Sequence, residues 1–96
     1  MGSTFIQHNP LAADGKEAFV AFVTWWTAQV PELKFDFKRV FAENDLVLVH
    51  HKRTLSPADR GSAVMDIFRF ENGKLVEHWD VIQDIPETPA NDNTMF

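Results

Sequence analysis

The sequence predicts an α+β fold in which one helix packs on a four-stranded antiparallel sheet. Three observations support this prediction. Apolar residues recur at helical spacing over residues 15–29. The four segments that follow alternate or are rich in β-branched residues, as strands are. Short turns of Gly, Asn and Asp separate them, as in hairpins. A chain of 96 residues has room for one core, so we expect a single domain over 1–96.

The helix is expected to begin after Asp14, which is a favourable N-cap, with Glu17 placed as in a capping box. Pro31 ends it. Its apolar stripe, which is typical of core or pocket wall, consists of Phe19, Val20, Phe22, Val23, Trp25, Trp26 and Val30. Residues 5–10 are interpreted as an extended piece that ends in a turn.

The expected strands are residues 34–42, 46–54, 62–71 and 74–83. Turns or loops at 43–45 and 56–61 separate the first three. Residues 85–96 are rich in Pro and Asn and are interpreted as a C-terminal tail, and residues 1–4 as a possible vector-derived remnant.

Composition narrows the function classes. The chain has no cysteine, so no disulfide framework is possible. A net charge of −5 disfavours nucleic acid and acidic membranes as partners. No segment is long and apolar enough to span a membrane, and no signal peptide is visible. We therefore expect a cytoplasmic protein.

The segment 62–83 is the most informative, because it places Asp66, His78 and Asp80 among apolar residues. Ionisable groups on an apolar sheet face are costly unless they pair, so they need a reason. A carboxylate buried beside apolar groups and another carboxylate has a raised proton affinity, which suits a general base.

The turn decides whether these groups share a face. A two-residue loop, Asn72-Gly73, would pair Asp66 with Trp79. A three-residue loop with a bulged Gly73 would pair Asp66 with His78. We favour the second, because it gathers the costly groups where they can satisfy one another. One face would then consist of Val64, Asp66, Phe68, Val76, His78, Asp80 and Ile82.

The opposite face would also be partly apolar, and one short helix cannot cover both faces. We therefore expect a homodimer that packs through this second face. Its interface residues would be Met65, Ile67, Trp79 and Val81.

The chain resembles the SnoaL-like polyketide cyclases of the nuclear-transport-factor-2-like superfamily, over residues 5–96. The string Glu77-His-Trp-Asp-Val-Ile-Gln83 is quite specific to a bacterial branch. The resemblance also rests on Gln7-His-Asn-Pro10, Asp14-Gly-Lys-Glu-Ala-Phe19, the Val49-His50 strand, Pro57-Ala-Asp-Arg-Gly61, Asp66-Ile-Phe-Arg69 and the Gly73-Lys-Leu-Val76 run.

This resemblance implies a cone-shaped fold in which a curved sheet encloses a pocket, with oligomers formed through the outer sheet face. It also implies ring closure by intramolecular aldol condensation without metal or organic cofactor. The single acid–base Asp of such cyclases corresponds to Asp80 here, and a second polar position to Asp66. The related limonene epoxide hydrolases also place a carboxylate at the Asp80 position.

Two departures from the family pattern affect the pocket. Family members usually have a long helix before Gln7, and this chain shows none, so we expect a less closed pocket. The branch often has His-Xaa-His on the second strand. Here Lys52 follows His50 and His51, which predicts a more cationic pocket.

The candidate catalytic residues are Asp80, Asp66, His78 and His50. Asp80 is the expected base, or else a structural partner of a neighbouring cation. Asp66 would donate to an enolate oxygen or simply pair with His78, and His78 would orient Asp80 or be a satisfied core histidine. His50 reaches the pocket if it faces inward with Lys52.

The candidate substrate-binding residues are His8, Phe22, Trp25, Trp26, Lys52 and Phe68. The aromatic side chains suit a ring-shaped ligand, although core packing explains them nearly as well. His8 belongs either to the pocket rim or to a simple turn. The His and Asp residues have no recognised metal-binding spacing, so we expect neither metal nor cofactor.

The sequence thus predicts a small-molecule-binding protein with cofactor-free acid–base chemistry on an apolar, oxygenated substrate. A non-catalytic binding or dimerisation module and an epoxide hydrolase remain alternatives.

Overall fold

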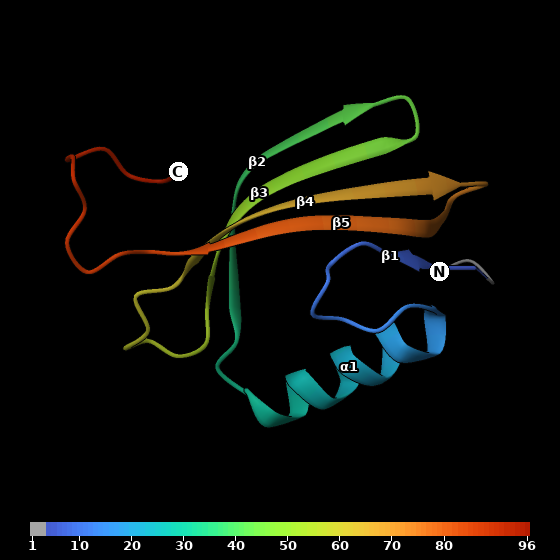
Figure 1. The fold of residues 1–96 in the computed structure, drawn as a ribbon, viewed down its shortest axis with the longest axis horizontal. Helices are drawn as coiled ribbons and strands as arrows, with labels where there is room; N and C mark the ends of the chain where they lie inside the picture. Colours follow the sequence, from blue (N-terminus) through green and yellow to red (C-terminus); the bar gives the residue numbers. More distant parts are fainter. Residues whose placement is uncertain (1–3) are drawn as a thin grey trace.

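The computed structural model describes residues 4–96 and shows one sheet with a helix on one face (Figure 1). The α+β class is confirmed, with five strands instead of four. The strand order is β1-β5-β4-β3-β2. The elements are β1 (Ile6–Gln7), α1 (Lys16–Gln29), β2 (Lys34–Glu43), β3 (Leu46–Thr54), β4 (Ser62–Glu71) and β5 (Lys74–Asp84). Most of the possible vector-derived remnant, residues 1–3, lies outside the described residues.

The additional strand is β1, which was expected only as part of an extended piece. It pairs in parallel with β5, so that Gln7 lies beside His78. The backbone N–H of His8 donates to the carbonyl of His78 at 2.9 Å and continues this pairing. β1 was missed because a two-residue strand has almost no periodicity of its own; the free edge of β5 supplies its hydrogen-bond partners.

Helix α1 matches the expected range, but the predicted capping box does not form. Gly15 is the N-cap residue, and no side chain caps the helix. Instead, Oδ1 of Asp14 accepts a hydrogen bond from the backbone N–H of Gln7 at 2.8 Å, which ties β1 to the start of α1. The helix ends before Pro31, as expected, with the N–H of Val30 donating to the carbonyl of Trp26.

The predicted three-residue turn between β4 and β5 is wrong. Glu71 pairs with Lys74 across a two-residue turn, in which Asn72 (φ 53°) and Gly73 (φ 74°) are both left-handed, as a type I′ turn requires. Such a turn by itself would have placed Asp66 opposite Trp79.

A β-bulge restores the expected faces by a different route. Phe70 pairs with Leu75, whereas Arg69 pairs with Glu77, so Val76 is the extra residue. The bulge shifts the remaining register by one, and Asp66 therefore lies directly opposite Asp80. The predicted face is still correct for Val64, Asp66, Phe68, His78, Asp80 and Ile82, which all line one cavity.

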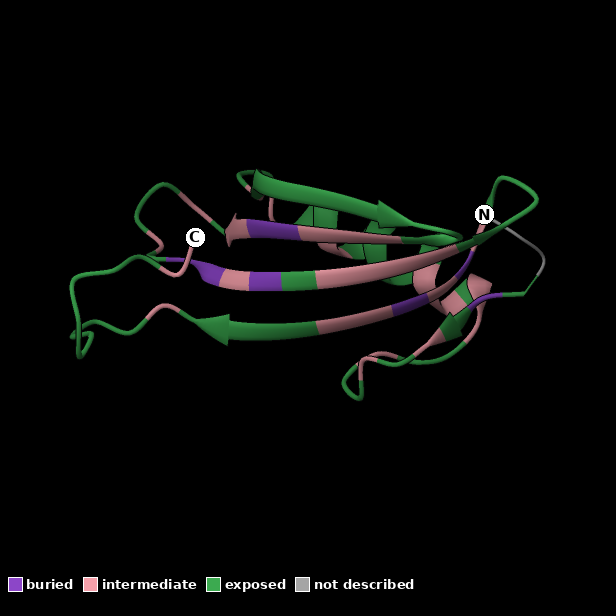
Figure 2. Cartoon of the chain, turned by 90° about the horizontal axis from the view of Figure 1, so that it is seen from above, coloured by how far each residue is buried: buried purple, intermediate pink, exposed green. Residues whose placement is uncertain are grey.

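A second irregularity between Phe37 and Arg39 interrupts the pairing of β2 with β3, and β2 bends strongly in Figure 1. The core is small. The buried apolar residues are Phe5, Val64 and Val76, and α1 has no buried residue (Figure 2). No helix in the described part of the chain is long and apolar enough to cross a membrane.

Candidate functional site

A cavity of about 440 Å³ lies on the sheet face that carries the acidic residues, which we call the inner face. Its wall is largely apolar, and its polar side chains come mainly from the central strands. The lining residues are Gln7, Asn9, Leu11, Ala12, Ala13, Ala18, Phe19, Phe22, Trp26, Phe35, His51, Arg53, Val64, Asp66, Phe68, His78, Asp80 and Ile82. This volume and lining are typical of small-molecule sites.

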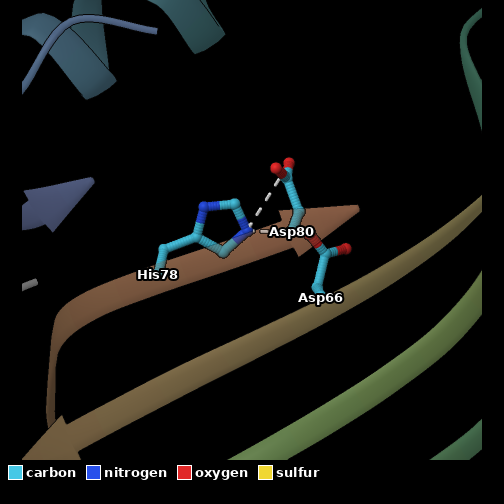
Figure 3. A group of neighbouring side chains, drawn as sticks. All are labelled: Asp66, His78 and Asp80. Carbon is cyan, nitrogen blue, oxygen red and sulfur yellow. Dashed lines mark hydrogen bonds and ion pairs between the residues drawn. The ribbon is translucent and has the colours of Figure 1, made fainter. Parts of the chain in front are cut away.

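Asp66 is at the centre of a hydrogen-bond network at the cavity floor. Its Oδ2 lies 2.7 Å from Nε2 of His51, and its Oδ1 lies 2.7 Å from Nε2 of His78. All three side chains are largely buried, with 13 % of Asp66 exposed. Figure 3 shows the carboxyl of Asp66 beside the His78 ring, in contact across β4 and β5. Both oxygens of Asp66 are therefore occupied by imidazole groups.

Gln7 determines where the proton of His78 lies. The side-chain oxygen of Gln7 accepts a hydrogen bond from the backbone N–H of Asn9 at 3.1 Å, so it is also an acceptor toward Nδ1 of His78 at 2.9 Å. Nδ1 of His78 must then carry a proton. The short contact between its Nε2 and Asp66 needs a second proton, held either by the imidazolium or by a protonated carboxyl group. One proton therefore lies in the contact between Asp66 and His78.

His51 shares Asp66 but has a simpler state. Its Nδ1 is buried and has no hydrogen-bond partner among residues 4–96. A protonated Nδ1 there would be a buried donor without an acceptor, which is costly. The network therefore assigns the neutral tautomer to His51, with the proton on Nε2 and directed at Asp66.

Asp80 differs from Asp66, because it is buried but accepts no hydrogen bond from the described residues. Only 11 % of its side chain is exposed, and its Oδ2 lies 4.0 Å from Nε2 of His78. No side chain in the described part of the chain donates a hydrogen bond to it at ordinary distance. Its carboxyl group therefore faces the cavity as a free acceptor, beside an imidazole that can support its charge.

The donor atoms of Asp66, His78 and Asp80 lie within 4.8 Å of one another, which is close enough for a metal ion. A cation there would have to replace the hydrogen bonds at 2.7 Å that Asp66 makes with His51 and His78. The geometry therefore suits a proton network better than a metal centre.

Two predicted pocket residues lie on the opposite, outer face. His50 contacts Arg39 through Nδ1 at 2.9 Å and the carbonyl of Met95 through Nε2 at 3.0 Å. Lys52 alternates with His51 and Arg53, and it pairs with Asp36, away from the cavity. The prediction that alternate residues of β3 share a face is correct, but the wrong set of residues was assigned to the cavity.

His8 and Trp25 are also outside the cavity. Nε2 of His8 donates to Glu77 at 2.6 Å, and its ring stacks on Trp79 with a centroid distance of 4.7 Å, both on the outer side of the sheet. Trp25 is 59 % exposed on α1. Of the other predicted substrate-binding residues, Phe22, Trp26 and Phe68 line the cavity, and Phe68 stacks on His78.

Four polar cavity residues were not predicted from the sequence: His51, Arg53, Gln7 and Asn9. For the first two, the only available signal was the alternation of β3. Val47 and Val49 on one side are as apolar as Leu46 and Leu48 on the other, so the pattern could not give the phase. Gln7 depends on the docking of β1, which no periodicity indicated.

On the outer face, the Glu77 carboxylate accepts hydrogen bonds from two side chains. It accepts from His8 at 2.6 Å and from Nε of Arg69 at 2.7 Å. These hydrogen bonds, first that from His8 and then that from Arg69, hold the pKa of the Glu77 carboxyl below its ordinary value.

A curved sheet with one helix on its inner face and a partly open cavity with a polar floor is the arrangement of the nuclear-transport-factor-2-like class. The chain belongs to the SnoaL-like domain family, whose sequence model matches residues 2–78. No curated protein matches the chain significantly.

Two solved structures share the fold. TsrD from Streptomyces laurentii is 23 % identical, with a TM-score of 0.67; the match covers 84 % of this chain and 69 % of TsrD. A loop-truncation variant of IdmH is 16 % identical, with a TM-score of 0.66, and the match covers 85 % of this chain and 73 % of that one.

Proposed function

We propose that the cavity binds a ring-shaped, oxygenated small molecule and catalyses proton transfer at a carbon next to a carbonyl group, with Asp80 as the base. The observation that carries the proposal is the contrast between the two acids. Asp66 is fully engaged by His51 and His78, whereas Asp80 is buried at the cavity wall without a hydrogen bond from residues 4–96. A base has to be free to accept a proton.

The proposed steps need no other reactant. The carboxylate of Asp80 takes a proton from the carbon, and the electron pair of the C–H bond moves toward the carbonyl oxygen to give an enolate. The proton shared by Asp66 and His78 is the group that we assign to the enolate oxygen. Isomerisation returns the proton at another carbon. In an aldol closure, the enolate carbon bonds to a second carbonyl carbon, and the resulting alkoxide takes the proton back from Asp80.

Hydrogen–deuterium exchange tests this proposal with a simple probe. The probe is 2-tetralone in D₂O, and proton NMR follows the loss of its signal next to the carbonyl. We expect exchange above the buffer rate with the native protein, and the buffer rate with Asp80→Asn. Asp36→Asn, on the outer face, is the matched control and should keep the native rate. Equal exchange by Asp80→Asn and the native protein would rule out Asp80 as the base.

A second candidate function is binding without catalysis. Phe22 lines the cavity and yet is 46 % exposed, and α1 has no buried residue, so the cavity is open to water. Access of water weakens electrostatic stabilisation of an enolate. Saturable binding of 2-tetralone without exchange above the buffer rate would favour this function over acid–base chemistry.

We further propose that two copies pack through the outer face. Met65 and Val81 are cross-strand partners there, with 44 % and 72 % of their surfaces exposed. Phe41 adds another exposed apolar side chain to the same face. Ile67 and Trp79 are only partly exposed, and His8 stacks on Trp79. Met65 and Val81 would therefore make most of the contact.

A further inference from the structure

We propose that the molecule bound in the cavity carries a carboxylate, and that Arg53 is the residue that binds it. This inference rests on the proposed function, because it names the substrate class of the same cavity. Arg53 lies on the inner face of β3 and lines the cavity together with His51, Asp66 and Asp80.

Arg53 has no partner that accounts for its charge. Its Nε is buried without a hydrogen bond, and no carboxylate of residues 4–96 lies within ion-pair distance of its guanidinium group. A buried donor without an acceptor is costly, so the unpaired Nε marks Arg53 as a residue whose partner comes from outside the chain. The chain has 14 acidic residues for 9 basic ones, so the missing partner does not reflect a shortage of acids.

The other arginines show what a satisfied guanidinium looks like here. Arg69 pairs with Glu77, Arg39 contacts His50, and Arg60 donates to the carbonyl of Ile85. Asp59 is the acid whose charge interacts with Arg53 at longer range. Its oxygens, however, accept hydrogen bonds from the backbone N–H groups of residues 55 and 61, which lower its pKa.

Trp26 orients the guanidinium group. The central carbon of Arg53 lies 5.5 Å from the centroid of the Trp26 ring, in a cation–π contact. The two terminal N–H₂ groups of Arg53 make no hydrogen bond within residues 4–96 and are not buried, so they remain available to a ligand. Two parallel N–H groups on one edge of a guanidinium match the two oxygens of a carboxylate, a geometry that a lysine cannot reproduce.

The register indicates the size of the ligand. Val49 lies opposite Asp66, which pairs with Asp80, and Arg53 is four residues further along β3. Four residues of strand span roughly 13 Å, and the long arginine side chain shortens the remaining gap. A fused-ring ketone with its acid group at one end could therefore reach Arg53 while its reactive carbon lies at Asp80.

The test compares two probes of the same shape, 2-naphthoate and neutral 2-naphthamide, by isothermal titration calorimetry on the full chain. We expect the native protein to bind 2-naphthoate about tenfold more tightly, because only the anion satisfies the guanidinium edge. Arg53→Gln should lose this preference and bind 2-naphthamide with native affinity. Lys74→Gln, which removes an exposed positive charge from the start of β5, should keep the preference.

Circular dichroism verifies that each variant folds. If Arg53→Gln does not fold, Arg53→Lys replaces it, and we expect a preference reduced several-fold, because lysine keeps the charge but not the paired donors. Equal affinity of the native protein for both probes, or an unchanged preference in the folded variant, would overturn the carboxylate inference alone. Failure of both probes to bind would contradict the proposed binding function as well.

Discussion

Two acids on neighbouring strands have opposite roles in stability, although they are cross-strand partners. Asp66 makes hydrogen bonds with two buried imidazoles, whereas Asp80 is buried with no such bond in the described part of the chain. A buried group that serves two donors stabilises the fold, and a buried carboxylate without donors costs free energy. The fold therefore needs Asp66 and tolerates Asp80, as is common for a functional residue.

This contrast gives the first prediction. Asp66→Ala should lower the free energy of unfolding by about 1–3 kcal/mol, because it leaves Nε2 of both His51 and His78 buried without a hydrogen-bond partner. Asp80→Asn should change it by less than about 0.5 kcal/mol or increase it. Urea unfolding followed by tryptophan fluorescence measures both. A greater loss in Asp80→Asn than in Asp66→Ala would contradict the network.

Glu77 predicts a pH dependence of stability. Its pKa is lower in the folded chain than its ordinary value of 4.5, chiefly through the hydrogen bond from His8 and then that from Arg69. A carboxyl whose pKa falls on folding contributes stability above its unfolded pKa, and this contribution is lost as the pH falls through the folded value. Glu77→Gln should therefore be less stable than the native protein at pH 7, and the difference should shrink toward pH 3.

The measurement is the urea midpoint at both pH values. Glu87→Gln, in the exposed tail, is the control and should show no difference at either pH. A difference between Glu77→Gln and the native protein that is the same at pH 3 and pH 7 would exclude a contribution from the carboxylate charge.

At the scale of the elements, turns and bulges position the site. The turn at Asn72-Gly73 and the bulge at Val76 together put Asp66 opposite Asp80. At the other end of β4, Gly61 lies against the backbone of Arg53 in a left-handed conformation (φ 93°). Gly61 and Gly73 both have positive φ, but only at Gly61 would an added Cβ meet other atoms. The pair therefore distinguishes the cost of backbone strain from the cost of a steric clash.

Two alanine substitutions test this separation. Gly73→Ala should cost about 1–2 kcal/mol from backbone strain alone, because no atom lies within 4 Å of the added Cβ. Gly61→Ala should cost more, because its Cβ would lie 2.9 Å from the carbonyl oxygen of Arg53. Thermal unfolding of the two variants gives the order. An equal loss would show that the loop before β4 moves freely to accommodate the methyl group.

At the scale of the whole molecule, the chain exposes more apolar surface than its small core buries. The buried apolar residues are Phe5, Val64 and Val76, while large apolar side chains are exposed on both sides of the sheet. Small domains with little core often gain stability by association. The outer face, with its exposed pair Met65 and Val81, is the surface that we assign to this contact.

Val81→Lys should dissociate the proposed homodimer, because it places a charge at the centre of an apolar interface. Val20→Lys, at an exposed position on α1, is the matched control and should leave the mass unchanged. Light scattering coupled to size-exclusion chromatography at micromolar concentration measures the mass. A native protein that elutes with the mass of one chain would refute the dimer.

Local sequence patterns determined much of this protein. The helix over residues 16–29 and the four long strands follow from their periodicities, and residues 64, 66, 68, 78, 80 and 82 could be assigned to one face. The helix and the strands were predicted correctly because side-chain periodicity acts over only a few positions. The common face is correct although the predicted turn is wrong, because the bulge at Val76 restores the same alternation.

Only the tertiary structure decided which side of β3 faces the cavity. For this reason His51 and Arg53 belong to the site, whereas His50 and Lys52 do not. It also decided that β1 docks on β5 and that a bulge at Val76 corrects the register. The physical reason is that alternation shows which residues share a face but not which face is covered. That choice depends on hydrogen bonds and packing between segments far apart in the sequence.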